Sequence, residues 1–437
     1  MCTLIYNDII NRARELEQET VSIRRDLHKH PESGFFEFRT MSVIYYTLTS
    51  LGYDVKYGDS VTDVNALMAI PSISKIKEEK NRAISEGADE ALILPLPAGC
   101  TGLVATLRGN GDDKVVAFRF DMDSNELCES ESENHKPYAE GFSSIRKGMT
   151  HACGHDGHVA IGLTLAKLLA ENKDKIHGTV KLIFQPAEEG VRGAAGMVAA
   201  GVVDDVDYFF SGHIGISANK TGELYTSTDK FLCASKFDAE FFGKSAHAGL
   251  KPQEGENALL AAAQAALSLH GISRHGAGAS RINVGVLNAG TSRNVIPDHA
   301  LLQFETRGEN STINDYMIER SKAIIQASAD IYDVEYKIEC VGYADSIVPD
   351  PIFAHEIAEI AKESSIYSSV SEYGLMNASE DCSAFINRVV SRGGKATYLL
   401  FGSHLASAHH TAEFDFDEKS MTDAAAFLSI LALKYTK

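Results

Sequence analysis

The segment THACGHDGH places five side chains that can bind a metal ion within eight residues: His151, Cys153, His155, Asp156 and His158. Its two glycines let the loop fold tightly, and imidazole, thiolate and carboxylate groups are the ligands that divalent ions such as zinc take in proteins. A single histidine is more often a core or surface residue than a ligand. A cluster of this density instead favours a metal site.

Two carboxylates follow in the segment QPAEEG, directly after the apolar run VKLIF. Because neighbouring side chains of a strand point to opposite faces, Glu188 and Glu189 are not expected to share one role. One can bind a metal ion while the other transfers protons. The alternative is a solvated acidic turn.

Further histidines follow two more predicted strands. YFFSGH places His213 at the end of one strand, and HLASAHHTAEFDFDE supplies His404, His409 and His410 after the strand ATYLLF. Adjacent histidines can also lie on the surface without a function, but one of these is expected to be a distal ligand of the metal ion. In open α/β sheets ligands bind at the carboxyl ends of strands, so these segments are expected to converge. Mixed carboxylate, imidazole and thiolate ligands suit metal-assisted hydrolysis, in which the ions acidify a water and polarise a carbonyl.

The elements that position these residues follow an α/β pattern. Short apolar strands alternate with helical segments, which predicts a central sheet covered by helices. Between about 231 and 347 the order changes to strand, helix, strand, strand, helix, strand, which is the ferredoxin-like split unit. The α/β pattern then resumes. We therefore expect one domain of residues 1–230 and 348–437, with a second domain, residues 231–347, inserted into it.

The composition is that of a globular protein: of 437 residues, 44% are hydrophobic and 23% are charged. The net charge of −19 disfavours nucleic acids and anionic membranes as partners. No run approaches the roughly 20 apolar residues of a membrane span, and the first residues lack a signal-peptide core, so a cytoplasmic location is expected. The 7 scattered cysteines are odd in number, so they cannot all be paired, and thiols are available as ligands.

Seven motifs, in order, resemble those of the M20 metallopeptidase superfamily, in its amidohydrolase branch: RRDLHKHPESGFFEFRT, FRFDMD, THACGHDGH, IFQPAEEG, SAHAG, GTSRNVIP and HHTAEFDFDE. The resemblance runs almost end to end. It implies a catalytic domain with two divalent metal ions and an inserted lid that also dimerises. The resemblance points to Mn²⁺ as the metal, whereas a thiolate ligand favours Zn²⁺. The resemblance leaves two assemblies open. The chain can form a homodimer, or it can form a heteromer with a second kind of subunit of the same fold, a B subunit.

Matched position by position, the resemblance implies Glu188 as general base and five metal ligands, which are Cys153, His155, Glu189, His213 and His410. Many relatives carry a His-x-Asp ligand motif where this chain has Arg119-Phe120-Asp121. Asp121 and Asp123 are therefore expected to orient ligands rather than to bind metal. His151, His158 and His409 receive no assigned role.

In the predicted lid, the resemblance implies that His247 reaches into the partner's active site and assists at the oxyanion. Asn294 and Arg307 fall on positions that contact substrate, and a guanidinium group can grip a carboxylate at two points. The chain departs from the branch after Asp123, where it continues Ser-Asn-Glu-Leu-Cys and relatives often have Asp-Ala-Leu-Pro. The conformation of this loop and the role of Cys128 are therefore open.

The resemblance implies hydrolysis of the amide between an aryl acyl group and an amino acid. The expected substrate is p-aminobenzoyl-glutamate, cleaved to p-aminobenzoate and glutamate. One alternative is a general N-acyl-amino-acid or hippurate-type amidohydrolase. Another is a non-catalytic regulatory subunit of the same fold, which would hold metal but hydrolyse no acyl amino acid.

Overall fold

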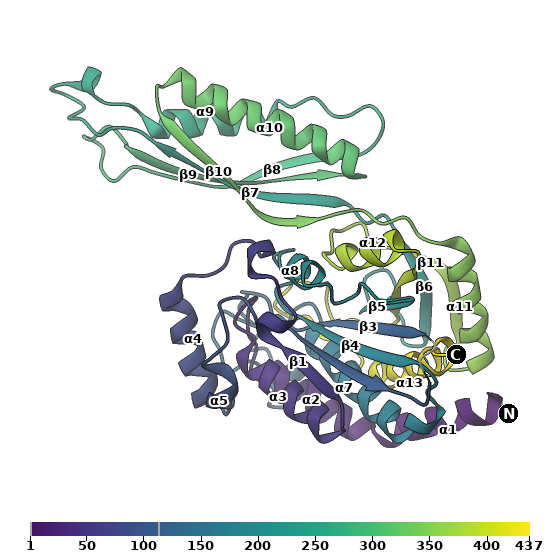
Figure 1. Cartoon of the computed structure of the whole chain (residues 1–437). Coiled ribbons are helices and arrows are strands. Elements are labelled where there is room, and N and C mark those ends of the chain that lie inside the picture. Colours follow the sequence, from purple (N-terminus) through teal and green to yellow (C-terminus); the bar gives the residue numbers. More distant parts are fainter. Residues whose placement is uncertain (1, 112–113) are drawn as a thin grey trace. The chain divides into compact units, whose positions relative to one another are not determined.

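The computed structural model describes residues 2–111 and 114–437, which form two compact units (Figure 1). Unit 1 takes the described residues up to Asp229 together with Ile347–Met376 and Asp381–Lys437. Unit 2 takes Lys230–Ser346 and Asn377–Glu380. The catalytic and lid roles assigned to residues 1–230 and 348–437, and to residues 231–347, stay predictions.

Unit 1 contains an eight-stranded sheet in the order β1-β2-β4-β3-β5-β12-β6-β11. Its strands are β1 (Asp54–Tyr57), β2 (Leu103–Arg108), β3 (Val115–Asp121), β4 (Thr179–Gln185), β5 (Tyr208–Ile214), β6 (Glu223–Asp229), β11 (Ser369–Leu375) and β12 (Lys395–Phe401). The central strands β4, β3, β5 and β12 run parallel, so their carboxyl ends meet at one edge of the sheet. The alternation of strands and helices confirms the predicted α/β class.

Helices cover both faces of this sheet. They are α1 (Cys2–Glu15), α2 (Glu17–Lys29), α3 (Phe38–Ser50), α4 (Ile73–Ser85), α5 (Glu90–Ile93), α6 (Lys136–Ala139), α7 (His155–Glu171), α8 (Ala194–Ala199), α11 (Pro351–Ser364), α12 (Ser383–Ser391) and α13 (Lys419–Tyr435). Short 3₁₀ turns lie at Gly58–Ser60, Val64–Ala66 and Lys173–Lys175. Figure 1 shows α7 and α13 on one side of the sheet and α8 and α12 on the other.

Helix α7 carries part of the candidate site and lies close against the sheet. At Gly162 an added Cβ would lie 2.8 Å from the ring of Phe120 and 2.9 Å from the ring of Phe184. A glycine is therefore needed for this approach, because any side chain would push the helix away from β3 and β4. Nearly the whole helix is buried, as expected for a helix that is apolar on all sides. Among the described residues, no helix is both long enough and apolar enough to cross a membrane.

Unit 2 is a four-stranded antiparallel sheet in the order β10-β7-β9-β8, with two helices. Its elements are β7 (Cys233–Phe242), a 3₁₀ turn (Pro252–Glu254), α9 (Ala258–His270), β8 (Ser280–Ala289), β9 (His299–Gly308), α10 (Ser311–Ile331) and β10 (Glu335–Ala344). The predicted ferredoxin-like order is confirmed. Alternate residues of β7 and β9 are buried, which places the apolar core on one face of the sheet.

Candidate metal centre

The carboxyl edge of the unit 1 sheet gathers polar side chains from five segments of the chain. Strand β3 ends at Asp121, and β4 is followed by the turn that holds Glu188 and Glu189. Strand β5 contributes His213. The loop before α7 and the loop after β12 contribute the remaining predicted ligands, which are Cys153, His155 at the first position of α7, and His410. The structure thus brings together the five residues predicted to bind metal and the predicted base.

The thiol of Cys153 lies at the centre of this cluster. Its Sγ atom is 3.3 Å from Nε2 of His213 and 3.3 Å from Nε2 of His410. The same Nε2 of His410 lies 3.3 Å from Oε2 of Glu189. Cys153, Glu189 and His410 form one group that could hold a metal ion, and Cys153, His155 and His213 form another, with ligand atoms within 4.8 Å of one another in each. Cys153 belongs to both groups, so its thiolate would be available to a metal ion held by either one.

The imidazole of His155 gives the clearest test of whether metal fits. Its Nε2 atom is buried and has no hydrogen-bond partner. Three carboxylate oxygens surround it, at 3.8 Å (Asp121 Oδ2), 3.9 Å (Glu189 Oε1) and 4.0 Å (Glu188 Oε2). These distances are too long for hydrogen bonds, and each is about twice a metal–ligand bond of roughly 2.0–2.2 Å. The residues therefore fit a divalent cation that lies between them.

The electric field of the cluster also favours a cation. Burial alone would lower the pKa of His155, but the carboxylates of Asp121, Asp123 and Glu189 raise it to about 10. These negative charges would stabilise a bound metal ion in the same way that they stabilise the imidazolium. Burial and the nearby histidines hold the pKa of His213 well below its usual range, so this imidazole is neutral and offers a lone pair.

Asp123 fixes the position of three of these residues. Its Oδ1 accepts a hydrogen bond from the backbone N–H of Glu188 and its Oδ2 accepts one from Glu189, each at 3.0 Å. Its backbone oxygen lies 2.8 Å from Nδ1 of His155. Because Nδ1 donates to this oxygen, Nε2 is left to face the carboxylates.

Asp121 is held by Arg119 and His158. Nη1 of Arg119 donates to its Oδ2 at 2.7 Å, and Nδ1 of His158 lies 2.5 Å from its Oδ1. Burial alone would raise the pKa of Asp121, but His155, His158 and Arg119 hold it well below its usual range. Asp121 therefore stays ionised beside the cluster.

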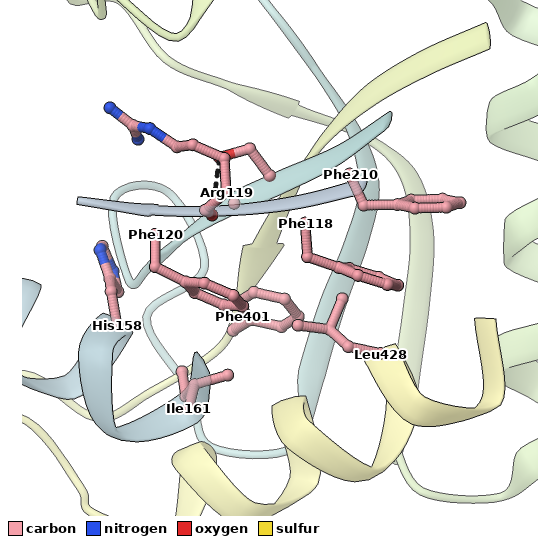
Figure 2. Close-up of a pocket in the computed structure, with 10 residues that line it drawn as sticks. Phe118, Arg119, Phe120, His158, Ile161, Phe210, Phe401 and Leu428 are labelled. Atoms are coloured by element: carbon pink, nitrogen blue, oxygen red, sulfur yellow. Dashed lines mark hydrogen bonds between the residues drawn. The ribbon is translucent and has the colours of Figure 1, made fainter. Parts of the chain in front are cut away.

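His158 differs from His155 because both of its ring nitrogens make hydrogen bonds. Nδ1 meets Asp121, and Nε2 accepts the backbone N–H of Ile214 at 3.1 Å. Figure 2 shows His158 beside Phe120, whereas Arg119 points to the opposite side of β3. The small cavity drawn there is about 10 Å³, which is close to the space that one water molecule requires, so it is not a substrate site.

The loop whose conformation the sequence left open supports the Cys153 loop. Asn125 pairs with Thr150 through backbone bonds of 3.0 and 3.1 Å, and its Oδ1 accepts the N–H of Ala152 at 3.0 Å. The carbonyl of Ala152 in turn accepts the N–H of His410 at 2.8 Å. His410 adopts a φ of +60°, a conformation that non-glycine residues rarely take and that this contact helps to hold. Cys128 is exposed and lies outside the candidate metal groups of the described residues.

A buried ionic network, which the sequence motifs alone did not reveal, lies behind the centre. The guanidinium of Arg24, on α2, donates to Asp156 (2.9 Å), Asp415 (2.6 Å) and Glu418 (3.2 Å). His28, one turn further along α2, lies 2.8 Å from both Asp156 and Glu129. Asp156 thus faces two cations instead of the cluster. The available clue was that Arg24 and His28 lie in the first of the resembling motifs.

The residues predicted to contact substrate from the lid all lie in unit 2. Nδ1 of His247 accepts the N–H groups of Gly249 and Leu250 at 3.1 and 3.2 Å. Asn294 lies beside it, because its backbone oxygen accepts the N–H of Ala248 at 3.1 Å. His247 and Asn294 therefore belong to one pair of adjacent loops.

Arg307 lies at the other end of the unit 2 sheet. It is opposite Ala234 in β7, whereas the loop of His247 follows Phe242 at the end of the same strand. Eight residues of extended strand separate these ends, or about 26 Å at roughly 3.3 Å per residue. Its guanidinium is paired with Glu305, with Nε 2.8 Å from Oε1. Unit 2 thus does not bring Arg307 together with His247 and Asn294.

Comparison with known proteins gives matches along nearly the whole chain. The model of the Peptidase family M20/M25/M40 matches residues 117–434. Indole-3-acetyl-aspartic acid hydrolase of Enterobacter agglomerans is 45% identical, over 97% of each chain. The A subunit of the p-aminobenzoyl-glutamate hydrolase of Escherichia coli (strain K12) is 44% identical, over 94% of each chain. The crystal structure of an aminobenzoyl-glutamate utilization protein from Klebsiella pneumoniae matches with a TM-score of 0.82 and 39% identity, over 97% of each chain.

Proposed function

Because the chain belongs to the peptidase family M20/M25/M40 and is a hydrolase of amide bonds, we propose that it cleaves the amide between an aromatic acyl group and an acidic amino acid. The names of two relatives support this substrate class. Indole-3-acetyl-aspartate and p-aminobenzoyl-glutamate both join an aromatic acid to aspartate or glutamate. We take p-aminobenzoyl-glutamate as the first candidate substrate, and the relative with 45% identity favours indole-3-acetyl-aspartate as the second.

The observation that carries the proposal is the buried Nε2 of His155, which has no hydrogen-bond partner and lies 3.8–4.0 Å from three carboxylate oxygens. We propose that two divalent ions bind here. Their ligands would be Cys153, His155, Glu189, His213 and His410. Such ions acidify a water and polarise the substrate carbonyl. The family resemblance favours Mn²⁺, and the thiolate would also suit Zn²⁺.

Glu188 would act as the general base. Its backbone is held by Asp123, and its Oε2 lies 4.0 Å from Nε2 of His155, at the edge of the cluster. The carboxylate would take a proton from the attacking water as the oxygen bonds to the acyl carbon. It would then give that proton to the amide nitrogen as the C–N bond breaks, which releases the aromatic acid and the amino acid.

Three residues of unit 2 would complete the site. We propose that His247 donates a hydrogen bond to the oxyanion of the tetrahedral intermediate in a partner's active site, and that Asn294 and Arg307 bind the substrate. The Escherichia coli relative is named as one of the subunits of its hydrolase, which supports a partner. A homodimer and a heteromer with a B subunit are the two assemblies that sedimentation would distinguish. A cytoplasmic location is part of the same proposal.

Hydrolysis assays test this function directly. The metal-loaded protein is expected to cleave p-aminobenzoyl-glutamate or indole-3-acetyl-aspartate faster than acetyl-glutamate and benzoyl-glycine. The Glu188→Gln variant keeps the shape of the side chain but deletes the base, so kcat is expected to fall by about 10²–10⁴-fold with both metals retained. Equal rates on all four compounds would support a general acyl-amino-acid hydrolase instead. A metal-loaded protein that cleaves none of them, with or without a B subunit, would support a regulatory role.

A further inference from the structure

We propose that Glu37 is a positioning residue that holds the catalytic turn, residues 187–189, through the backbone of Ala187. The catalytic part of this inference rests on the proposed function. Three successive N–H groups of the turn donate to buried carboxyl groups. Ala187 donates to Oε1 of Glu37 at 2.9 Å, and Glu188 and Glu189 donate to Asp123 at 3.0 Å each.

The surroundings of Glu37 give it no other evident task. The side chain is fully buried, and its Oε2 accepts a hydrogen bond from the hydroxyl of Thr101 at 2.6 Å. Burial, with a smaller effect of Asp123, raises the pKa of Glu37 to about 8. Burying a polar group is unfavourable unless its hydrogen bonds are made. An apolar side chain would fill this position at a lower cost, so what the glutamate supplies is an acceptor for the turn.

The turn needs such a contact because its conformation is strained. Ala187 has a φ of +54°, in the left-handed region that costs a non-glycine residue on the order of 1 kcal/mol. Such a residue persists only where its surroundings fix it. The chain packs tightly here, since an added Cβ at Gly34 would lie 2.9 Å from the Cα of Ala187. The bond to Glu37 is one of the contacts that fix Ala187, so its loss is expected to let Ala187 relax and to shift Glu188 and Glu189.

The test compares Glu37→Leu with Glu37→Gln and with a matched control, Glu32→Leu. Glu32 is also a fully buried glutamate that accepts backbone N–H groups, from Arg39 at 3.0 Å and Thr40 at 2.8 Å, but it has no side-chain bond to the catalytic turn. Both leucine variants lose stability. Only Glu37→Leu is expected to change the turn.

Three measurements follow the turn, and two of them do not depend on turnover. For Glu37→Leu we expect hydrogen exchange of a peptide covering residues 186–190 to rise at least about tenfold. We expect Mn²⁺ affinity to fall by about 10–100-fold, as on loss of other residues that support ligands, and kcat to fall by about 10²-fold with KM little changed. Glu37→Gln keeps a carbonyl towards Ala187 and an amide towards Thr101, so it is expected to behave like the unmodified protein.

Glu37→Asp is a second variant that keeps a carboxyl group but is one methylene too short to reach Ala187. It is expected to raise exchange in the turn even if Glu37→Leu does not fold. Unchanged exchange and metal affinity in Glu37→Asp or folded Glu37→Leu, or equal changes in Glu32→Leu, would overturn the inference. If the unmodified protein hydrolyses no acyl amino acid, the proposed function fails, but exchange and metal affinity still decide the role of Glu37.

Discussion

Replacing Arg24 with methionine is expected to destabilise unit 1 strongly. The variant keeps the length of the side chain but removes the cation that contacts Asp156, Asp415 and Glu418. Asp156 would keep its 2.8 Å contact with His28, and Glu418 would keep Arg25, but Asp415 would lose its 2.6 Å contact. Removing one partner of a buried ion pair costs about 3–5 kcal/mol, because the remaining charge stays buried. We expect the free energy of unfolding to fall by that amount.

Arg25→Met is the matched control for this prediction. Arg25 is the next residue on α2 and also binds Glu418, at 2.7 Å, but its side chain is 28% exposed. Partly exposed pairs contribute about 0–1 kcal/mol, so this variant should unfold close to the unmodified protein. The assay is urea unfolding followed by far-ultraviolet circular dichroism, at pH 7 and pH 5. The deficit of Arg24→Met should shrink at the lower pH, because a carboxylate without its cation takes up a proton more readily.

A loss below 1 kcal/mol in Arg24→Met, or a loss equal to that of Arg25→Met, would refute this reasoning. Metal affinity is a second measurement that tests the role of the Arg24 network. Asp156 is next to His155, and Asp415 belongs to the segment that follows His410. Loosening both segments should therefore lower metal affinity in Arg24→Met and leave it unchanged in Arg25→Met.

The other predictions concern a ligand, a buried histidine and a substrate contact. Cys153→Ser should lower metal occupancy by elemental analysis, and full occupancy with full activity would exclude the thiolate as a ligand. Burial alone would lower the pKa of His28, but its bonds to Asp156 and Glu129 raise it to about 9. The stability that His28 contributes is therefore complete below pH 6.5 and is lost as the pH rises through 9. In His28→Gln the urea midpoint should therefore depend less on pH across this range than in the unmodified protein. An unchanged dependence on pH would contradict the assignment. Arg307→Lys keeps the positive charge but cannot contact a substrate carboxylate at two points, so kcat/KM should fall by about tenfold to a thousandfold. An equal fall on a substrate analogue whose carboxylate is replaced by an amide would show that Arg307 does not bind that carboxylate.

The fold followed from the sequence because its elements are encoded locally. Apolar runs such as VKLIF and YFF became β4 and β5, and the change of order after residue 230 became the four-stranded sheet of unit 2. The meeting of Glu189, His213 and Cys153 was also predictable, because carboxyl ends of parallel strands share an edge. Where local periodicity misled, the difference is small. Apolar residues recur at helical spacing from Ile9 to Leu27, which predicts one helix, but the chain forms two helices, α1 and α2, that are separated at Leu16.

The roles of individual histidines could not be predicted in this way. His155 and His158 lie in one motif and one turn of α7, and nothing local distinguishes them. The distinction comes from groups distant in the sequence, because Asp121 and the N–H of Ile214 occupy both nitrogens of His158. The role of Arg24 could not be predicted for the same reason. Its partner Asp415 lies 391 positions away in the sequence, so only the folded chain shows that the guanidinium group of Arg24 contacts the Asp415 carboxylate.

The position of β12 in the sheet has a consequence for the time at which the protein can fold. This strand lies between β5 and β6, yet in the chain it follows the whole continuous part of unit 2. On the ribosome, β5 and β6 are therefore complete, each with an open edge, while more than a hundred further residues are translated. Unit 2 has its own core and can form during this interval, whereas unit 1 must wait. His410 follows β12 in the chain, so the candidate metal centre cannot be complete before β12 has been translated.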